Sequence, residues 1–169
     1  MTVRTNARIA GITFLVYIVA GIASLALSRR APATEVLSIV TSLCALVLGV
    51  TLYALTREQD PDLALLALTC RVIEAIPGRD GAIFFAVGSA LFSWLLLRGR
   101  MIPAAIAWLG IIASVLMVVI LPLQKAGAVA AGANWASIAT WLVWLPLLVF
   151  ELTLAFWLIV KGVYVHRRA

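Results

Sequence analysis

The chain has 169 residues, of which 64% are hydrophobic and only 12% are charged, and its mean hydropathy is +1.13. A soluble domain is typically about half apolar and about a quarter charged, so the composition excludes an ordinary water-soluble protein and indicates a single transmembrane helical domain over residues 1–169. The net charge of +6 does not indicate nucleic-acid binding, because the basic residues stand beside apolar runs and form no basic face with interleaved aromatic residues. Basic residues so placed are typical of loops that face anionic cytoplasmic lipid.

Charge-free intervals locate the membrane-spanning segments, because a bilayer crossing needs about 20 mainly apolar residues. Such intervals predict five helices, at residues 8–28, 35–56, 80–98, 101–123 and 136–162. A sixth segment, residues 62–77, has only 16 residues and contains Arg71 and Glu74. Its start at Pro61 and Asp62 is typical of a helix, and Pro77-Gly78 stops it. This segment is an amphipathic surface helix, a re-entrant piece or a short but complete crossing.

The distribution of basic residues favours a complete crossing. With six spans and both termini in the cytoplasm, eight Lys and Arg residues face the cytoplasm and four face the other side, with Arg71 left out. With five spans the best division is seven against five. Because Lys and Arg concentrate in cytoplasmic loops, we predict an all-α bundle of six spans, the third one short. The cytoplasmic set is Arg4, Arg8, Arg57, Arg98, Arg100, Lys161, Arg167 and Arg168, and the outer set is Arg29, Arg30, Arg79 and Lys125.

Glu151 lies within a very apolar stretch, residues 145–157, and an ionisable side chain there needs a partner, a proton or a water-filled cavity. In the six-span arrangement, a rise of 1.5 Å per residue places Arg71 about 13 Å and Glu151 about 15 Å below the cytoplasmic surface. Both are then near the middle of a core about 30 Å thick, and Glu74 shares a helix face with Arg71. We therefore predict that Arg71 bridges Glu74 and Glu151 between the third and sixth helices, because its planar guanidinium can hold two carboxylates.

Other residues are candidates for supporting roles around this cluster. Three full charges leave the cluster at net −1, so either one carboxyl carries a proton or another polar group joins. The candidate polar groups are Tyr17, Tyr53, Thr69 and Thr153. Pro146, five residues before Glu151, is expected to free backbone carbonyls and kink the last helix. The cluster either fixes the packing register of two helices, binds a polar ligand or an ion, or forms part of a partner interface.

Enzyme chemistry has little support in the sequence. The chain contains no GxSxG, HExxH, P-loop or GxGxxG motif. The single histidine, His166, lies in the basic tail, and Cys44 and Cys70 form no CxxC or Cys/His cluster, so we expect no catalytic residues, metal or cofactor. A structural or regulatory membrane protein is favoured, and a small transporter, ion pathway or lipid- or small-ligand-binding protein is the alternative. The lipid bilayer is the expected partner, and a second copy or another membrane protein remains open as a further one.

Four stretches together resemble a known family. They are ARIAG at residues 7–11 with its following apolar run, LALLAL at 63–68 leading to RVIEA at 71–75, LLLRGRMIP at 95–103, and ELTLAFWLIVKG at 151–162. The chain resembles the bacterial membrane family catalogued as domain of unknown function 4386. The resemblance implies a multi-pass protein of the bacterial inner membrane with Arg71, Glu74 and Glu151 at motif positions, and it implies no known activity. The chain differs from the family where residues 77–81 lead straight to the next helix, because the third helix of family members usually continues there.

Overall fold

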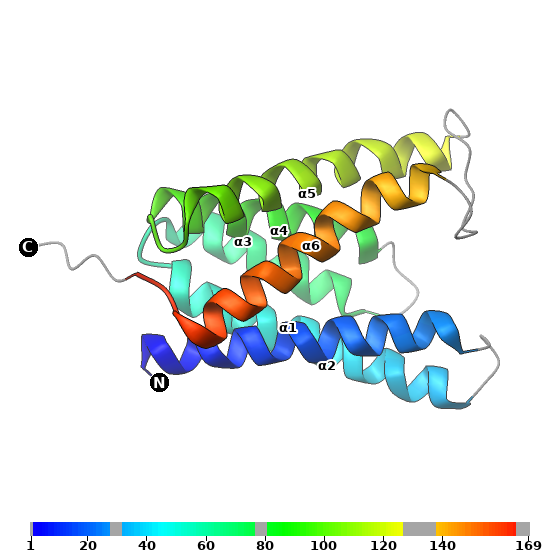
Figure 1. Ribbon diagram of the computed structural model, residues 1–169, viewed down its shortest axis with the longest axis horizontal. Helices are drawn as coiled ribbons and strands as arrows, with labels where there is room; N and C mark the ends of the chain where they lie inside the picture. Colours follow the sequence, from blue (N-terminus) through cyan, green and yellow to red (C-terminus); the bar gives the residue numbers. More distant parts are fainter. Residues whose placement is uncertain (1, 28–31, 77–80, 127–137, 165–169) are drawn as a thin grey trace, which may run out of the picture.

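The computed structural model describes residues 2–27, 32–76, 81–126 and 138–164, and these residues form six α-helices (Figure 1). The helices are α1 (Val3–Ala26), α2 (Pro32–Thr56), α3 (Pro61–Glu74), α4 (Gly81–Arg98), α5 (Ala104–Lys125) and α6 (Ile138–Val160). The prediction of an all-α fold is confirmed. Four helices, α1, α2, α4 and α5, are long and apolar enough to cross a membrane, and the segment Trp144–Val160 of α6 is a shorter apolar helix.

The six helices form a closed ring. Each helix packs against the next one in the chain, and α6 packs against α1, so the ring closes with α3 and α6 on opposite sides. Consecutive helices alternate in direction (Figure 1), and the start of α1 and the end of α6 lie at the same end as the α2–α3 and α4–α5 connections. We call this end the terminal end of the bundle. The interior of the ring is filled by large apolar side chains, among them Phe14, Leu48, Phe92, Met117 and Leu154.

Local signals set several helix ends. The side chain of Thr2 accepts a hydrogen bond from the backbone N–H of Thr5, so α1 begins before the apolar run and earlier than predicted. Asp60 caps α3 in the same way, through the N–H of Leu63, and Pro61 occupies the first turn, where its missing N–H costs nothing. Between α4 and α5, Arg100 has a φ of 50°, a left-handed conformation that ends α4 and turns the chain within a few residues.

The outer surface of the ring is apolar along most of its length. Large hydrophobic side chains are exposed on all six helices, for example Val19 on α1, Ile39 on α2, Ile112 on α5 and Phe156 on α6. A soluble monomer rarely exposes contiguous apolar surface on this scale. The exposed surface is therefore the surface that lipid tails cover.

The short helix α3 also exposes apolar side chains on the outer surface of the ring. Leu65, Leu66 and Val72 are exposed on its outer face, whereas its Arg71 side chain is only 1% exposed and faces the interior. Thr69 also lies on the outer face, but its hydroxyl donates to the carbonyl of Leu65 in the same helix. A helix lying on a membrane surface would turn its charged residues to water, whereas α3 turns Arg71 to the interior of the ring.

Close contact between α5 and its neighbours depends on Gly110. A Cβ atom at this position would overlap the ring of Phe150 on α6 and the hydroxyl of Ser93 on α4, and all three residues are buried. We expect Gly110→Ala to lower the free energy of unfolding by about 1–3 kcal/mol, because the buried ring must shift. The matched control is Gly21→Ala, where a Cβ meets no atom within 4 Å and the helix gains up to about 1 kcal/mol. Denaturant titration in mixed micelles measures both, and equal effects of the two variants would contradict the assigned packing.

Candidate functional site

The centre of the candidate site is the guanidinium of Arg71, which is almost completely buried inside the ring. One terminal nitrogen donates to Oε2 of Glu74 at 2.9 Å, and the other donates to the hydroxyl of Ser89 on α4 at 2.9 Å. The guanidinium carbon also lies 4.8 Å from the centre of the Phe85 ring, which places the cation over an aromatic face. Arg71 therefore links α3 to α4 through interactions with both Ser89 and Phe85.

Two glycines make room for the stem of Arg71. A Cβ on Gly49 of α2 would come within 2.9 Å of the Arg71 Cβ, and one on Gly88 of α4 would come within 3.2 Å of the Cys70 Cβ. The backbones of α2 and α4 therefore approach α3 closely on both sides of Arg71. This close approach keeps water and lipid away from the guanidinium, so its bonds form in a medium where they are strong.

Glu74 connects this pair to the first helix. Its Oε1 accepts a hydrogen bond from the hydroxyl of Tyr17 on α1 at 2.7 Å, while its Oε2 accepts from Arg71. The Tyr17 ring in turn stacks on Phe85, with ring centres 6.1 Å apart and an angle of 16° between the planes. Tyr17, Glu74, Arg71 and Ser89 form one continuous chain of hydrogen bonds, which we call the polar network, and it joins α1, α3 and α4.

Glu151 lies on α6, on the opposite side of the ring from α3. It is 5% exposed, and its Oε1 has no hydrogen-bond partner. It is near enough to Arg71 and Glu74 to interact with their charges, but no ion pair between described residues joins it to Arg71. The predicted bridge is therefore present on its Glu74 side, whereas the predicted direct contact with Glu151 is not made. The reason is the ring, which places α3 and α6 opposite each other instead of side by side.

The predicted supporting residues divide into two groups. Tyr17 joins the polar network directly, through its bond to Glu74. Thr69 and Thr153 are exposed, and each donates its hydroxyl to a carbonyl of its own helix. Tyr53 is partly buried against the apolar core, and α6 runs through Pro146 as one uninterrupted helix. Whether any of these residues acts in function stays a prediction.

Ser89 is the member of the network that the sequence did not single out. It lies one helical turn after Phe85 and one turn before Ser93, and all three side chains are buried. Two serines four residues apart in an apolar helix are common in membrane bundles, where they allow close packing, so their spacing carries little information. The signal that points to Ser89 is the need of a buried Arg71 for more acceptors than Glu74 supplies.

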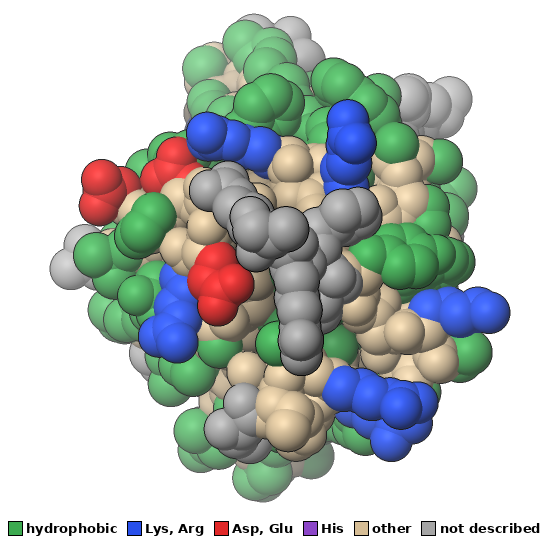
Figure 2. Space-filling model, turned by 90° about the vertical axis from the view of Figure 1, so that its left-hand side faces the viewer, with side chains coloured by type: hydrophobic (Ala, Val, Ile, Leu, Met, Phe, Trp, Pro, Cys, Tyr) green, Lys and Arg blue, Asp and Glu red, His purple; other side chains and the backbone are tan. Residues whose placement is uncertain are grey.

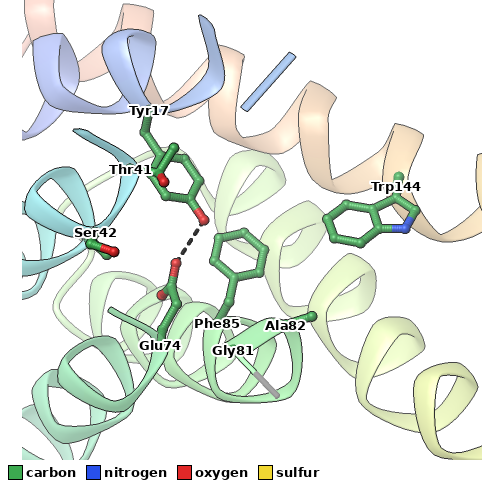
Figure 3. A pocket seen from close by; sticks show the side chains of 9 residues that line it. Tyr17, Thr41, Ser42, Glu74, Gly81, Ala82, Phe85 and Trp144 are labelled. Carbon is green, nitrogen blue, oxygen red and sulfur yellow. Dashed lines mark hydrogen bonds between the residues drawn. The ribbon is translucent and has the colours of Figure 1, made fainter. Parts of the chain in front are cut away.

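A cavity of about 250 Å³ adjoins the polar network (Figure 3). It is partly open, and it lies where α3 ends and α4 begins, next to α1, α2 and α6. In Figure 3 the bonded pair Tyr17 and Glu74 forms one wall, Phe85 lies beside them, and the indole of Trp144 reaches in from α6. The lining residues are Tyr17, Thr41, Ser42, Ala45, Glu74, Gly81, Ala82, Phe85 and Trp144.

The fold and the site together define a class: a helical protein with several apolar helices of membrane-crossing length around a buried charged network. Residues 80–162, about half of the chain, match the model of the DUF4386 family, a domain of unknown function. This match confirms the resemblance for the stretches at 95–103 and 151–162, and Glu151 lies within it. The stretches at 7–11 and 63–75 lie outside the matched range. No curated protein and no solved structure matches the chain.

A buried ion pair is strongly destabilising when one partner is removed, because the other charge stays buried and unpaired. We expect Arg71→Met to lower the free energy of unfolding by about 3–5 kcal/mol, and the double variant Arg71→Met with Glu74→Leu to recover part of that loss. The exposed pair of Arg98 and Asp60, joined at 3.1 Å, provides the control, and Arg98→Met is expected to cost less than about 1 kcal/mol. Denaturant titration of the three variants tests this, and an Arg71→Met protein as stable as Arg98→Met would show that the network does not stabilise the bundle.

Proposed function

We propose that the chain crosses the bacterial inner membrane six times, with both termini in the cytoplasm. The terminal end of the bundle supports this orientation, because Lys and Arg side chains gather there (Figure 2). The described helix ends and connections at this end contain the basic residues Arg4, Arg8, Arg57, Arg98, Arg100 and Lys161 and the acidic residues Glu58, Asp60 and Asp62. Positive charge in excess on one side is typical of the cytoplasmic face.

The short helix α3 is the shortest of the six proposed crossings. Its 14 residues rise about 21 Å, which is less than the hydrocarbon thickness of about 30 Å. Its apolar outer face and buried charges nevertheless favour a position inside the membrane, and it packs between α2 and α4. A short span is tolerated where neighbouring helices cover its polar end.

Two single-cysteine variants test this topology in a background that lacks Cys44 and Cys70. Glu58→Cys places a thiol in the α2–α3 connection and Ala126→Cys places one at the end of α5, and both positions are exposed. With six spans the two positions lie on opposite sides of the membrane, so an impermeant maleimide added to intact cells modifies the Ala126→Cys variant only. If α3 does not cross, the two positions share a side, and equal labelling of both variants would refute the six-span arrangement.

The activity that the geometry supports best is binding of a small ligand in the cavity beside Glu74. The observation that carries this proposal is that the carboxylate of Glu74 and the hydroxyl of Tyr17 form a wall of a partly open cavity. An apolar pocket with a few convergent polar groups is the usual form of a ligand site. A cavity of about 150 Å³ in a protein interior accommodates benzene, so the volume of about 250 Å³ suffices for a ring with a short polar extension.

The buried part of the network supports a structural role beside the binding role. Arg71 and Glu151 do not line the cavity, and both are nearly inaccessible. Arg71 therefore holds α3 against α4 and orients Glu74, while Glu74 is the charged group that a ligand reaches. The sequence left open a structural or regulatory protein and a transport or ligand-binding protein. The buried Arg71 favours a structural role for this residue, and the cavity favours a ligand-binding protein.

Cavity filling tests the binding role. Ser42 on α2 lines the cavity, whereas Ser38, one turn earlier on the same helix, does not line it. We expect the wild-type protein in nanodiscs to bind at least one of three small probes of similar size, 2-phenylethanol, 2-phenylethylamine and phenylacetate. Ser42→Leu is expected to weaken that binding about tenfold, because the larger side chain occupies the volume, and Ser38→Leu is expected to leave it unchanged. Isothermal titration calorimetry against empty nanodiscs measures the affinities, and the proposal fails if no probe binds or if both variants bind like wild type.

A further inference from the structure

We propose that the ligand of this cavity carries a protonated amine on a small apolar or aromatic body. This inference rests on the ligand-binding role proposed above and adds the chemical class of the ligand. It is carried by three features of the cavity wall: its charge, its aromatic rings and the state of its hydrogen-bond donors.

The charge on the wall is negative. Among the described residues that line the cavity, Glu74 is the only charged one. Arg71, its ion-pair partner, has a side chain that is 1% exposed and lies outside the lining. The side chain of Glu74 is 7% exposed but lines the cavity, so a ligand there meets the carboxylate and not the guanidinium. Each carboxylate oxygen can accept two hydrogen bonds, and Tyr17 and Arg71 supply one to each oxygen. Glu74 therefore retains one acceptor site on each oxygen for a donor from the ligand.

Three aromatic rings surround the same space. Tyr17, Phe85 and Trp144 come from α1, α4 and α6, and all three line the cavity (Figure 3). The faces of aromatic rings attract cations, and Phe85 already lies against the guanidinium of Arg71. Rings combined with a carboxylate suit an ammonium group on an apolar body, because the carboxylate accepts its N–H bonds and the rings cover the rest.

The wall offers little to an anion. The Tyr17 hydroxyl donates to Glu74, and the Thr41 hydroxyl donates to carbonyls of its own helix, those of Leu37 and Ser38. Ser42 is then the remaining hydroxyl among the described lining residues. The amino end of α4 at Gly81 attracts negative charge, but the carboxyl end of α3 at Glu74 lies at the same cavity and attracts positive charge, so the two helix ends offset each other.

An ammonium group of this kind occurs on a free amine and on the head group of phosphatidylethanolamine. The two sources share the chemistry that the cavity recognises, and membrane composition separates them. Nanodiscs of phosphatidylglycerol contain no lipid amine, whereas nanodiscs with phosphatidylethanolamine present the head group at high local concentration. If the lipid head group occupies the cavity, the second kind of nanodisc weakens binding of a free amine by competition.

The experiment compares the three probes of similar size on the full chain in phosphatidylglycerol nanodiscs. We expect 2-phenylethylamine to bind at least about tenfold more tightly than 2-phenylethanol, and phenylacetate to bind most weakly, because a charge-assisted hydrogen bond adds to the apolar contact. Tighter binding of the alcohol or of the acid overturns the amine assignment and leaves the ligand-binding role standing. Failure of all three probes overturns the ligand-binding role itself.

Two variants test whether the preference for the amine depends on side chains of the cavity wall. Glu74→Gln removes the negative charge and is expected to abolish the preference for the amine over the alcohol; its thermal midpoint shows whether it still folds. Trp144→Leu does not disturb the polar network, and we expect it to lower the ratio of amine to alcohol affinity several-fold through the lost ring face. Trp108→Leu is the matched control, because Trp108 is similarly exposed, at 50% against 44% for Trp144, but lies on α5 away from the cavity. An amine preference that survives both Glu74→Gln and Trp144→Leu would show that the amine binds elsewhere.

Discussion

The structure depends on the burial of one guanidinium inside an apolar ring. A cation surrounded by hydrocarbon is unstable unless polar, charged or aromatic groups replace its lost hydration. Both terminal nitrogens of Arg71 donate hydrogen bonds, whereas its buried Nε has no hydrogen-bond partner among the described residues. Arg71 meets a carboxylate, a hydroxyl and an aromatic face, and these belong to Glu74, Ser89 and Phe85. Two of these partners lie on α4, so the requirement to satisfy Arg71 fixes how α3 and α4 pack. Gly49 and Gly88 then allow the helices on both sides to close around its stem.

The cavity is a consequence of the short third helix. Helix α3 ends at Glu74, and α4 begins at Gly81, whose backbone lies against the same glutamate. The neighbouring helices α1 and α2 are much longer, at 24 and 25 residues against 14. Helices α1 and α2 continue past the end of α3, and among the described residues Glu74, Tyr17 and Trp144 line the space beside them.

The sequence predicts the fold well because the membrane simplifies the problem. Apolar length and charge spacing are enough to locate six helices to within a few residues, except at α1, where the cap at Thr2 extends the helix beyond the apolar run. The ion pair of Arg71 and Glu74 can also be predicted from the sequence, because residues three apart on a helix are neighbours. Depth along the membrane normal could be counted from the sequence, but the lateral arrangement of helices could not. The sequence therefore predicts that Glu151 is buried, but not that it lies apart from Arg71, and it does not point to Ser89.

The separation of Glu151 from Arg71 gives the two carboxyl groups different surroundings. Glu74 is bonded to Tyr17 and Arg71 and opens onto a cavity, so its charge is compensated on one side and available on the other. Glu151 is enclosed, its Oε1 has no hydrogen-bond partner among the described residues, and it does not line the cavity. A charge that arrives beside Glu74 changes the field at Arg71 and, across the ring, at Glu151, because electrostatic interactions are weakly screened in a low-dielectric interior.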